Sequence, residues 1–187
     1  MIELTDADRV FVKAARAAGA LCDLDGEKIH APNGTILLAC ADGDQFFELL
    51  HHHCHIAKTV RHHALLLNGG PLLVAPASPI ENAGTDGEVL LRHIDAAVPM
   101  KGIPTVVLCT HAPCGAARKA NLDFLDVLRL LMEAKLRLRK SLDLKSVERI
   151  HCFCHVDHGG NHKRTYCVLR IPACAFLEAL GRPVRMF

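Results

Sequence analysis

Cysteine and histidine are the residue types with the most obvious chemistry here, because the sequence holds 9 cysteines and 13 histidines among its 187 residues. Cys40 ends a short apolar run, and His111 and Cys114 follow closely on another. Thiolate sulfur and imidazole nitrogen are ligands that zinc prefers in proteins. Nine cysteines cannot all pair within one chain, and the N-terminal segment MIELTDADRV is acidic and mixed rather than a secretory signal. We therefore expect a cytoplasmic protein whose cysteines are metal ligands or buried thiols rather than disulfides.

The elements that must position these residues follow from the hydrophobic pattern. Short continuous apolar runs indicate strands buried on both faces, and apolar residues spaced by three or four indicate helices. The pattern predicts strands at 35–40, 71–75, 105–109, 147–156 and 163–170, and helices at 5–19, 44–67, 86–98, 121–140 and 172–181. Residues 20–33 are polar and marked by turn residues.

The order of these elements predicts an α/β fold. Strands that alternate with helices, followed by two consecutive strands, indicate a central, mainly parallel β-sheet flanked by helices, with an antiparallel strand at its C-terminal edge. A chain of 187 residues fits a single domain, 1–187, in which residues 1–33 form an N-terminal helical arm and lead-in.

Functional groups of an open parallel sheet gather where its strands end. Cys40 stands at the end of the 35–40 strand, and His111-Ala112-Pro113-Cys114 comes just after the 105–109 strand. If these two strands are neighbours, Cys40, His111 and Cys114 converge on one metal ion. Two thiolates and one imidazole suit zinc, and three protein ligands leave a fourth position for water or substrate. Cys109 lies inside the strand run and is interpreted as a small buried residue.

The segments Cys40-Ala41-Asp42 and His111-Ala112-Pro113-Cys114-Gly115, each with its strand, resemble the motifs of the β-carbonic anhydrase family. The resemblance extends from about residue 34 to residue 170. It implies a β-carbonic-anhydrase-like fold and a zinc ion held by Cys40, His111 and Cys114, with zinc-bound hydroxide attacking CO2 to give bicarbonate. It also implies that Asp42 orients the zinc-bound water, and that the protein is a homodimer or higher homo-oligomer whose N-terminal helix reaches a partner subunit.

One motif position departs from the family. The family has Cys-x-Asp-x-Arg after its first strand, and its arginine holds the aspartate away from the metal. Asp44 stands here in place of that arginine. We therefore predict that Asp42 becomes a fourth zinc ligand and closes the site, unless Arg61, Arg92 or Arg118 reaches it from elsewhere.

The segment after the predicted 71–75 strand also departs. The family shows Arg-Asn-Ala-Gly after its second strand, whereas residues 74–80 of this chain read VAPASPI. Asn82-Ala83-Gly84 is interpreted as a displaced counterpart. This predicts a reshaped substrate pocket.

These observations lead us to expect zinc-dependent, reversible hydration of CO2 to bicarbonate, with Asp42 as the catalytic carboxylate. Two alternatives stay open. One is hydrolysis of a related small electrophile, carbonyl sulfide or carbon disulfide. The other is a non-catalytic zinc-binding homologue with a closed site. A replacement arginine beside Asp42 would favour the enzyme, and direct ligation of zinc by Asp42 would favour the non-catalytic homologue.

Composition disfavours other classes of function. The net charge is only +2, aromatic residues make up 4% and tryptophan is absent, so nucleic acid is not an expected partner. No apolar run reaches the roughly 18 residues of a membrane span. The expected partners are a small substrate and further copies of the chain.

Two further clusters of histidine and cysteine have a simpler interpretation. His51, His52, His53 and His55 with Cys54 are interpreted as a solvated helix face, although His51 and His55 have the i, i+4 spacing that can chelate a transition metal. In the 147–156 strand, alternation places Cys152 and Cys154 in the core and His151, Phe153 and His155 on the other face, with His155, His158 and His162 gathering at the turn. The spacing does not match a zinc finger.

Overall fold

The fold is built around a six-stranded sheet with the order β1-β6-β5-β4-β2-β3. The computed structural model describes residues 3–24, 29–58, 61–141, 147–160 and 162–169. The strands are β1 (Leu21–Asp23), β2 (Thr35–Cys40), β3 (His62–Leu67), β4 (Thr105–Ala112), β5 (Arg149–Asp157) and β6 (Lys163–Val168). Strands β3, β2, β4 and β5 run parallel, while β6 and β1 complete one edge in antiparallel pairing. The predicted mainly parallel sheet with an antiparallel edge is confirmed.

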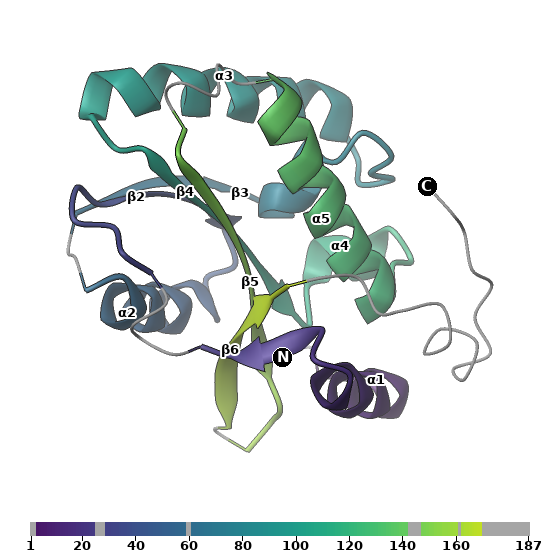
Figure 1. Ribbon diagram of the computed structural model, residues 1–187. Helices are drawn as coiled ribbons and strands as arrows, with labels where there is room; N and C mark the ends of the chain where they lie inside the picture. Colours follow the sequence, from purple (N-terminus) through teal and green to yellow (C-terminus); the bar gives the residue numbers. More distant parts are fainter. Residues whose placement is uncertain (1–2, 25–28, 59–60, 142–146, 161, 170–187) are drawn as a thin grey trace.

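Helices cover both faces of this sheet. They are α1 (Asp6–Ala17), α2 (Phe46–Ala57), the 3₁₀ helix η1 (Gly70–Val74), α3 (Ala83–Lys101), α4 (Gly115–Lys119) and α5 (Phe124–Ser141). Helices α3 and α5 lie on one side of the sheet and α2 on the other (Figure 1). Every residue of β2 and β4 is buried, as expected of strands covered on both faces.

Helix α1 begins where its capping residues predict. The Thr5 hydroxyl accepts a hydrogen bond from the Asp8 amide at 3.1 Å, and the Asp8 carboxylate accepts one from the Thr5 amide at 3.0 Å, forming a capping box. The apolar side of the helix packs on its own chain. The Phe11 ring packs edge-on against the Phe124 ring of α5, with the ring centroids 5.4 Å apart.

The predicted helix over 44–67 is wrong in its second half. Helix α2 ends at Ala57, and Lys58 adopts a left-handed conformation at φ 48°, which ends the helix. Residues His62–Leu67 instead form the edge strand β3, parallel to β2. The spacing of apolar residues continues from helix to strand, so the sequence pattern alone does not show the boundary.

The predicted strand at 71–75 is also wrong, because Gly70–Val74 forms the 3₁₀ helix η1. Gly70 has φ 52°, and a Cβ there would lie 2.5 Å from the backbone of Ala39. The chain therefore passes directly over β2 at a point that only glycine fits, and this close passage prevents a strand.

The other predicted elements that lie among the described residues are present with shifted ends, and helix α4 (Gly115–Lys119) was not predicted. Strand β4 runs to Ala112, so that His111 lies within the strand rather than after it. The short strand β1 arises in the 20–33 segment, where only turns were predicted. The predicted helix 172–181 lies outside the described residues. No helix among the described residues combines the length and apolarity needed to cross a membrane.

Buried His53 contradicts the prediction that the histidines of α2 form a solvated face. Its side chain is 3% exposed, and its Nε2 lies 2.8 Å from the Thr35 hydroxyl of β2. Burial, with smaller contributions from His62 and His151, lowers the pKa of His53 from 6.5 to about 3. The folded protein thus resists protonation of this ring.

We predict that His53 makes folding stability depend on pH. The folded pKa lies below the unfolded value, so the stabilisation is complete above pH 6.5 and is lost as the pH falls towards 3. The slope is about 1.4 kcal/mol per pH unit for one histidine. Urea unfolding of the wild type and His53→Gln from pH 7.5 to 4 measures it. In His53→Gln the free energy of unfolding should depend on pH less steeply than in the wild type, by the contribution of one proton. The control His93→Gln, on the exposed side of α3, should keep the wild-type slope. Equal slopes for His53→Gln and wild type would contradict the prediction.

Candidate metal centre

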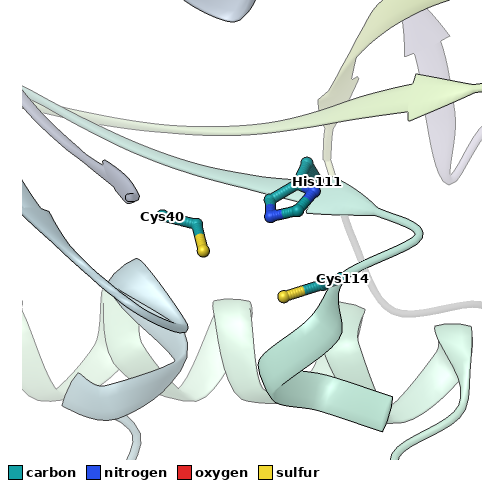
Figure 2. A group of neighbouring side chains, drawn as sticks. All are labelled: Cys40, His111 and Cys114. Carbon is teal, nitrogen blue, oxygen red and sulfur yellow. The ribbon is translucent and has the colours of Figure 1, made fainter. Parts of the chain in front are cut away.

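Cys40, His111 and Cys114 come together at the carboxyl edge of two neighbouring parallel strands. Strands β2 and β4 pair directly, with Ala39 opposite Cys109. Cys40 is the last residue of β2, His111 lies near the end of β4, and Cys114 precedes the first turn of α4. The two sulfur atoms and a ring nitrogen of His111 all lie within 4.8 Å of one another. Figure 2 shows the three side chains pointing toward a common centre.

All three side chains are buried, with exposures of 6% for Cys40, 1% for His111 and 4% for Cys114. Neither ring nitrogen of His111 has a hydrogen-bond partner among the described residues. Leaving buried polar atoms unpaired is costly, so such groups call for a partner. Two sulfurs and an imidazole with free nitrogens match the donor set of zinc.

The backbone of the loop after β3 supports the sulfur of Cys40. The Gly69 amide donates a hydrogen bond to the Cys40 sulfur at 3.2 Å. Gly69 has φ 92°, a left-handed conformation that suits glycine and aims its N–H at the sulfur. A hydrogen bond of this kind stabilises negative charge on a metal-bound thiolate and fixes its direction.

The three groups interact strongly in the absence of a metal. The close approach of Cys114, followed by burial, raises the pKa of the Cys40 thiol far above its usual value. The same approach lowers the pKa of Cys114 and favours its thiolate. Burial opposes a charged His111, but the neighbouring Cys114 thiolate and Asp42 outweigh it and raise the pKa of the imidazole. Without a metal, the site therefore keeps a proton on Cys40 and a thiolate on Cys114, and a dication bound there would displace the proton and take both sulfurs as thiolates.

Asp42 lies beside this group without belonging to it. Its Oδ1 accepts a hydrogen bond from the Asp44 amide at 2.9 Å, and its Oδ2 lies 3.8 Å from His111 Nε2. The side chain is 28% exposed and lines the adjoining cavity together with Cys40. The local turn thus holds one carboxylate oxygen and leaves the other facing the centre.

The arginines considered as substitutes for the motif arginine lie elsewhere. Arg61 donates to the carbonyls of Asn33 and Lys101, at the opposite end of β3. Arg118 donates to the carbonyl of Glu3, and Arg92 is exposed on α3. Within the part of the chain that the structure describes, no arginine pairs with Asp42.

A cavity of about 630 Å³ opens next to the centre. Cys40 and Asp42 line it, and Asn68, Asn82, Asp86 and Lys119 are among its other lining residues. It provides access from solvent to a buried group of donor atoms.

The loop that lines this cavity corrects one sequence interpretation. The second parallel strand is β3, and the residues after it are Asn68-Gly69-Gly70 rather than Pro76-Ala77-Ser78. The comparison of residues 74–80 with the family segment Arg-Asn-Ala-Gly was therefore made at the wrong place. Asn68-Gly69-Gly70, and not residues 74–80, follows the second parallel strand of this sheet. Asn68-Gly69-Gly70 comes directly after the predicted helix 44–67, so in the sequence it is indistinguishable from the stop of that helix.

The other histidine and cysteine predictions have mixed outcomes. Cys152 and Cys154 are core residues as predicted, and Cys109 is buried inside β4. His158 and His162 do meet at the turn, with ring centroids 5.1 Å apart. His155 does not join them, because it is fully buried and its ring packs against His52 of α2.

Comparison with known proteins gives matches at the level of solved structures. A scan against protein-family models finds no match, and a search of curated proteins finds none. A carbonic anhydrase from Streptococcus mutans is similar at 16% identity, over 89% of this chain and 99% of that one, with a TM-score of 0.48. The β-carbonic anhydrase isoform I of Trichomonas vaginalis is similar at 10% identity, over 89% of this chain and 100% of that one, with a TM-score of 0.45.

We predict that the three converging side chains set the affinity for zinc. Cys40→Ser and Cys114→Ser should each weaken binding by more than about 100-fold, because loss of a ligand exceeds the cost of losing an outer-shell partner. Competition with a chromogenic chelator measures the affinity. Cys54→Ser on α2 is the matched control and should bind zinc as the wild type does. Equal affinities for Cys114→Ser and Cys54→Ser would show that the triad does not hold the metal.

Proposed function

We propose that this protein is a zinc enzyme of the β-carbonic anhydrase type that hydrates CO2 to bicarbonate. The observation that carries the proposal is the buried group Cys40, His111 and Cys114 at the carboxyl edge of β2 and β4, open to a cavity. Three protein donors with a route to solvent are the arrangement of a catalytic rather than a structural zinc site.

Zinc is the metal we propose, on the grounds of its donors. Two thiolates cancel its double positive charge, and thiolate ligands disfavour hard cations such as magnesium and calcium. When bound, zinc supplies Lewis-acid activation of water for attack on a small electrophile. The chain's own contribution is to fix the ligands, through the pairing of β2 with β4 and the Gly69 amide on Cys40.

Asp42 is the residue that we propose orients water. Its Oδ1 is held by the Asp44 amide, so its Oδ2 is directed toward the His111 side of the cavity. A carboxylate in that position can accept a hydrogen bond from a water in the site. This would orient the water so that a lone pair of its oxygen faces the incoming CO2.

A non-catalytic zinc protein is the second candidate, and one observation favours it. Among the described residues no arginine holds Asp42, and Asp44 adds a second carboxylate to the same turn. A carboxylate without a cationic partner, 3.8 Å from a ligand imidazole, can turn onto the metal as a fourth ligand. Four protein ligands would leave no position for water.

Stopped-flow CO2 hydration by zinc-loaded protein tests the proposal. We predict a rate well above the buffer background that Cys40→Ser abolishes. If Asp42 orients water, Asp42→Asn lowers the rate by about 100-fold, the scale found for losing one preorganised polar group. A wild type at the background rate that Asp42→Asn activates would support the closed, non-catalytic site instead.

Two checks make this result decisive. Asp95→Asn, on the exposed side of α3, is the matched control for a lost carboxylate and should keep the wild-type rate. Zinc content must be equal in all samples, so that a low rate reports chemistry rather than metal loss. Repeating the assay with carbonyl sulfide and carbon disulfide identifies the preferred electrophile.

Homodimer formation is a further part of the proposal, taken from the family resemblance. Light scattering of the zinc-loaded protein measures it directly. A monomeric mass across micromolar concentrations would contradict it.

A further inference from the structure

The histidine-rich helix α2 carries a second group of metal-binding side chains, outside the centre described above. His51 and His55 are one turn apart on the exposed side of the helix, and their ring centroids are 4.7 Å apart. Two imidazoles on one tetrahedral zinc have nitrogens about 3.3 Å apart, given Zn–N bonds of 2.0–2.1 Å. The two rings lie close enough for side-chain rotation to bring one nitrogen of each to that separation.

A surface cavity of about 330 Å³ lies beside His51. It is lined by Phe47, Glu48, His51, His52 and Lys163, so the imidazole of His51 faces solvent-filled space rather than packed side chains. His55 does not line it, so an ion held by both rings lies at the rim of the cavity and keeps room for water ligands. The Glu48 carboxylate lies one turn before His51 and pairs with the Lys163 ammonium at 2.8 Å, so these two charges of the cavity lining offset each other.

Buried polar atoms also point toward this part of α2. His155 is fully buried on β5, its Nδ1 lies 2.9 Å from the Thr165 hydroxyl, and its Nε2 has no hydrogen-bond partner. That nitrogen lies 3.9 Å from a Glu48 carboxylate oxygen, which in turn lies 2.8 Å from Lys163. The His52 ring packs 5.3 Å from that of His155. Imidazoles, the Glu48 carboxylate and the Lys163 ammonium paired with it therefore lie around the cavity, from helix and sheet.

Burial keeps the inner rings of this group neutral near pH 7. It lowers the pKa of His155 to about 4, and it lowers the pKa of His52 with a smaller contribution from the charge of His51. These inner rings therefore add no positive charge that would repel a cation.

We propose that His51 and His55 chelate a second divalent transition-metal ion, of the nickel, copper or zinc class, at the surface of α2. Imidazole nitrogen suits these ions, and the i, i+4 spacing places both donors on one side of the metal. Among the described residues, three donors lie within 4.8 Å of one another only at Cys40, His111 and Cys114, so the second site is a two-histidine chelate completed by water.

The site is distinct from the first centre in donors and in exposure. It has nitrogen donors at the surface, whereas the first centre has two buried sulfurs. Ions that prefer nitrogen, such as Ni²⁺, should therefore bind at α2 when zinc already fills the thiolate centre.

Calorimetric titration of zinc-loaded protein with Ni²⁺ tests the proposal. We expect one Ni²⁺ per chain, and an affinity that falls by more than about tenfold in His51→Gln and in His55→Gln, since each removes half of the chelate. His93→Gln, an exposed histidine of α3, is the matched control and should bind Ni²⁺ as the wild type does. All three substitutions are at exposed helix positions, so folding is retained.

A second titration, in the Cys40→Ser background, keeps the test independent of the first centre. There the thiolate centre is broken, and the α2 site should still take one Ni²⁺ with the same loss in His51→Gln. The proposal is overturned if His51→Gln and His55→Gln bind Ni²⁺ as tightly as His93→Gln, or if neither background binds an ion at α2.

Discussion

The parallel pairing of β2 with β4 is the constraint on which the rest of the structure depends. These strands are distant in sequence, yet their alignment brings Cys40 and His111 to the same edge. Both strands are buried along their whole length, and a shift of one residue would turn buried side chains to the wrong face. The hydrophobic core therefore fixes the register, and the register fixes the distance between the donors. The Cys114 sulfur is then added by the turn that leads into α4.

Electrostatics at the centre follows from this geometry. The core that forces the donors together also removes water from them. The two sulfurs and the imidazole therefore cannot all take their ordinary protonation states, and the pKa values of Cys40 and Cys114 shift in opposite directions. A bound dication relieves that conflict, which is the physical reason to expect metal affinity. Asp42 differs from the three donors, because it lies at the cavity side, partly exposed and without an arginine partner among the described residues. The side chains that would hold an ion and the carboxylate that would act beside it are therefore separate parts of this site.

The sequence carried enough information to predict the centre but not all of the path to it. The apolar runs at 35–40 and 105–109 are unambiguous because both strands are buried on both faces, and the donors follow directly from their ends. Strand β3 was missed because it is an edge strand of intermediate burial, whose apolar residues continue the spacing of α2. The apolar run of η1 was misinterpreted because packing between β2 and the helices α3 and α5, rather than strand pairing, buries it. Local pattern cannot reveal either fact, since both depend on contacts with β2.

The buried histidines also show that local sequence pattern does not predict contacts between a helix and the sheet. The pattern of α2 placed all its histidines toward solvent, yet His53 is buried because Thr35 of β2 offers it a hydrogen bond at 2.8 Å. Polar residues can face the sheet here because the sheet provides polar partners, Thr35 for His53 and Thr165 for His155. Helix α2 thus presents imidazoles to both the core and the surface. It also begins directly after the turn that holds Asp42, whose carbonyl accepts the Phe46 amide at 2.9 Å. The residues beside the first centre and the donors of the second site therefore belong to one continuous turn and helix, so a rigid α2 serves both.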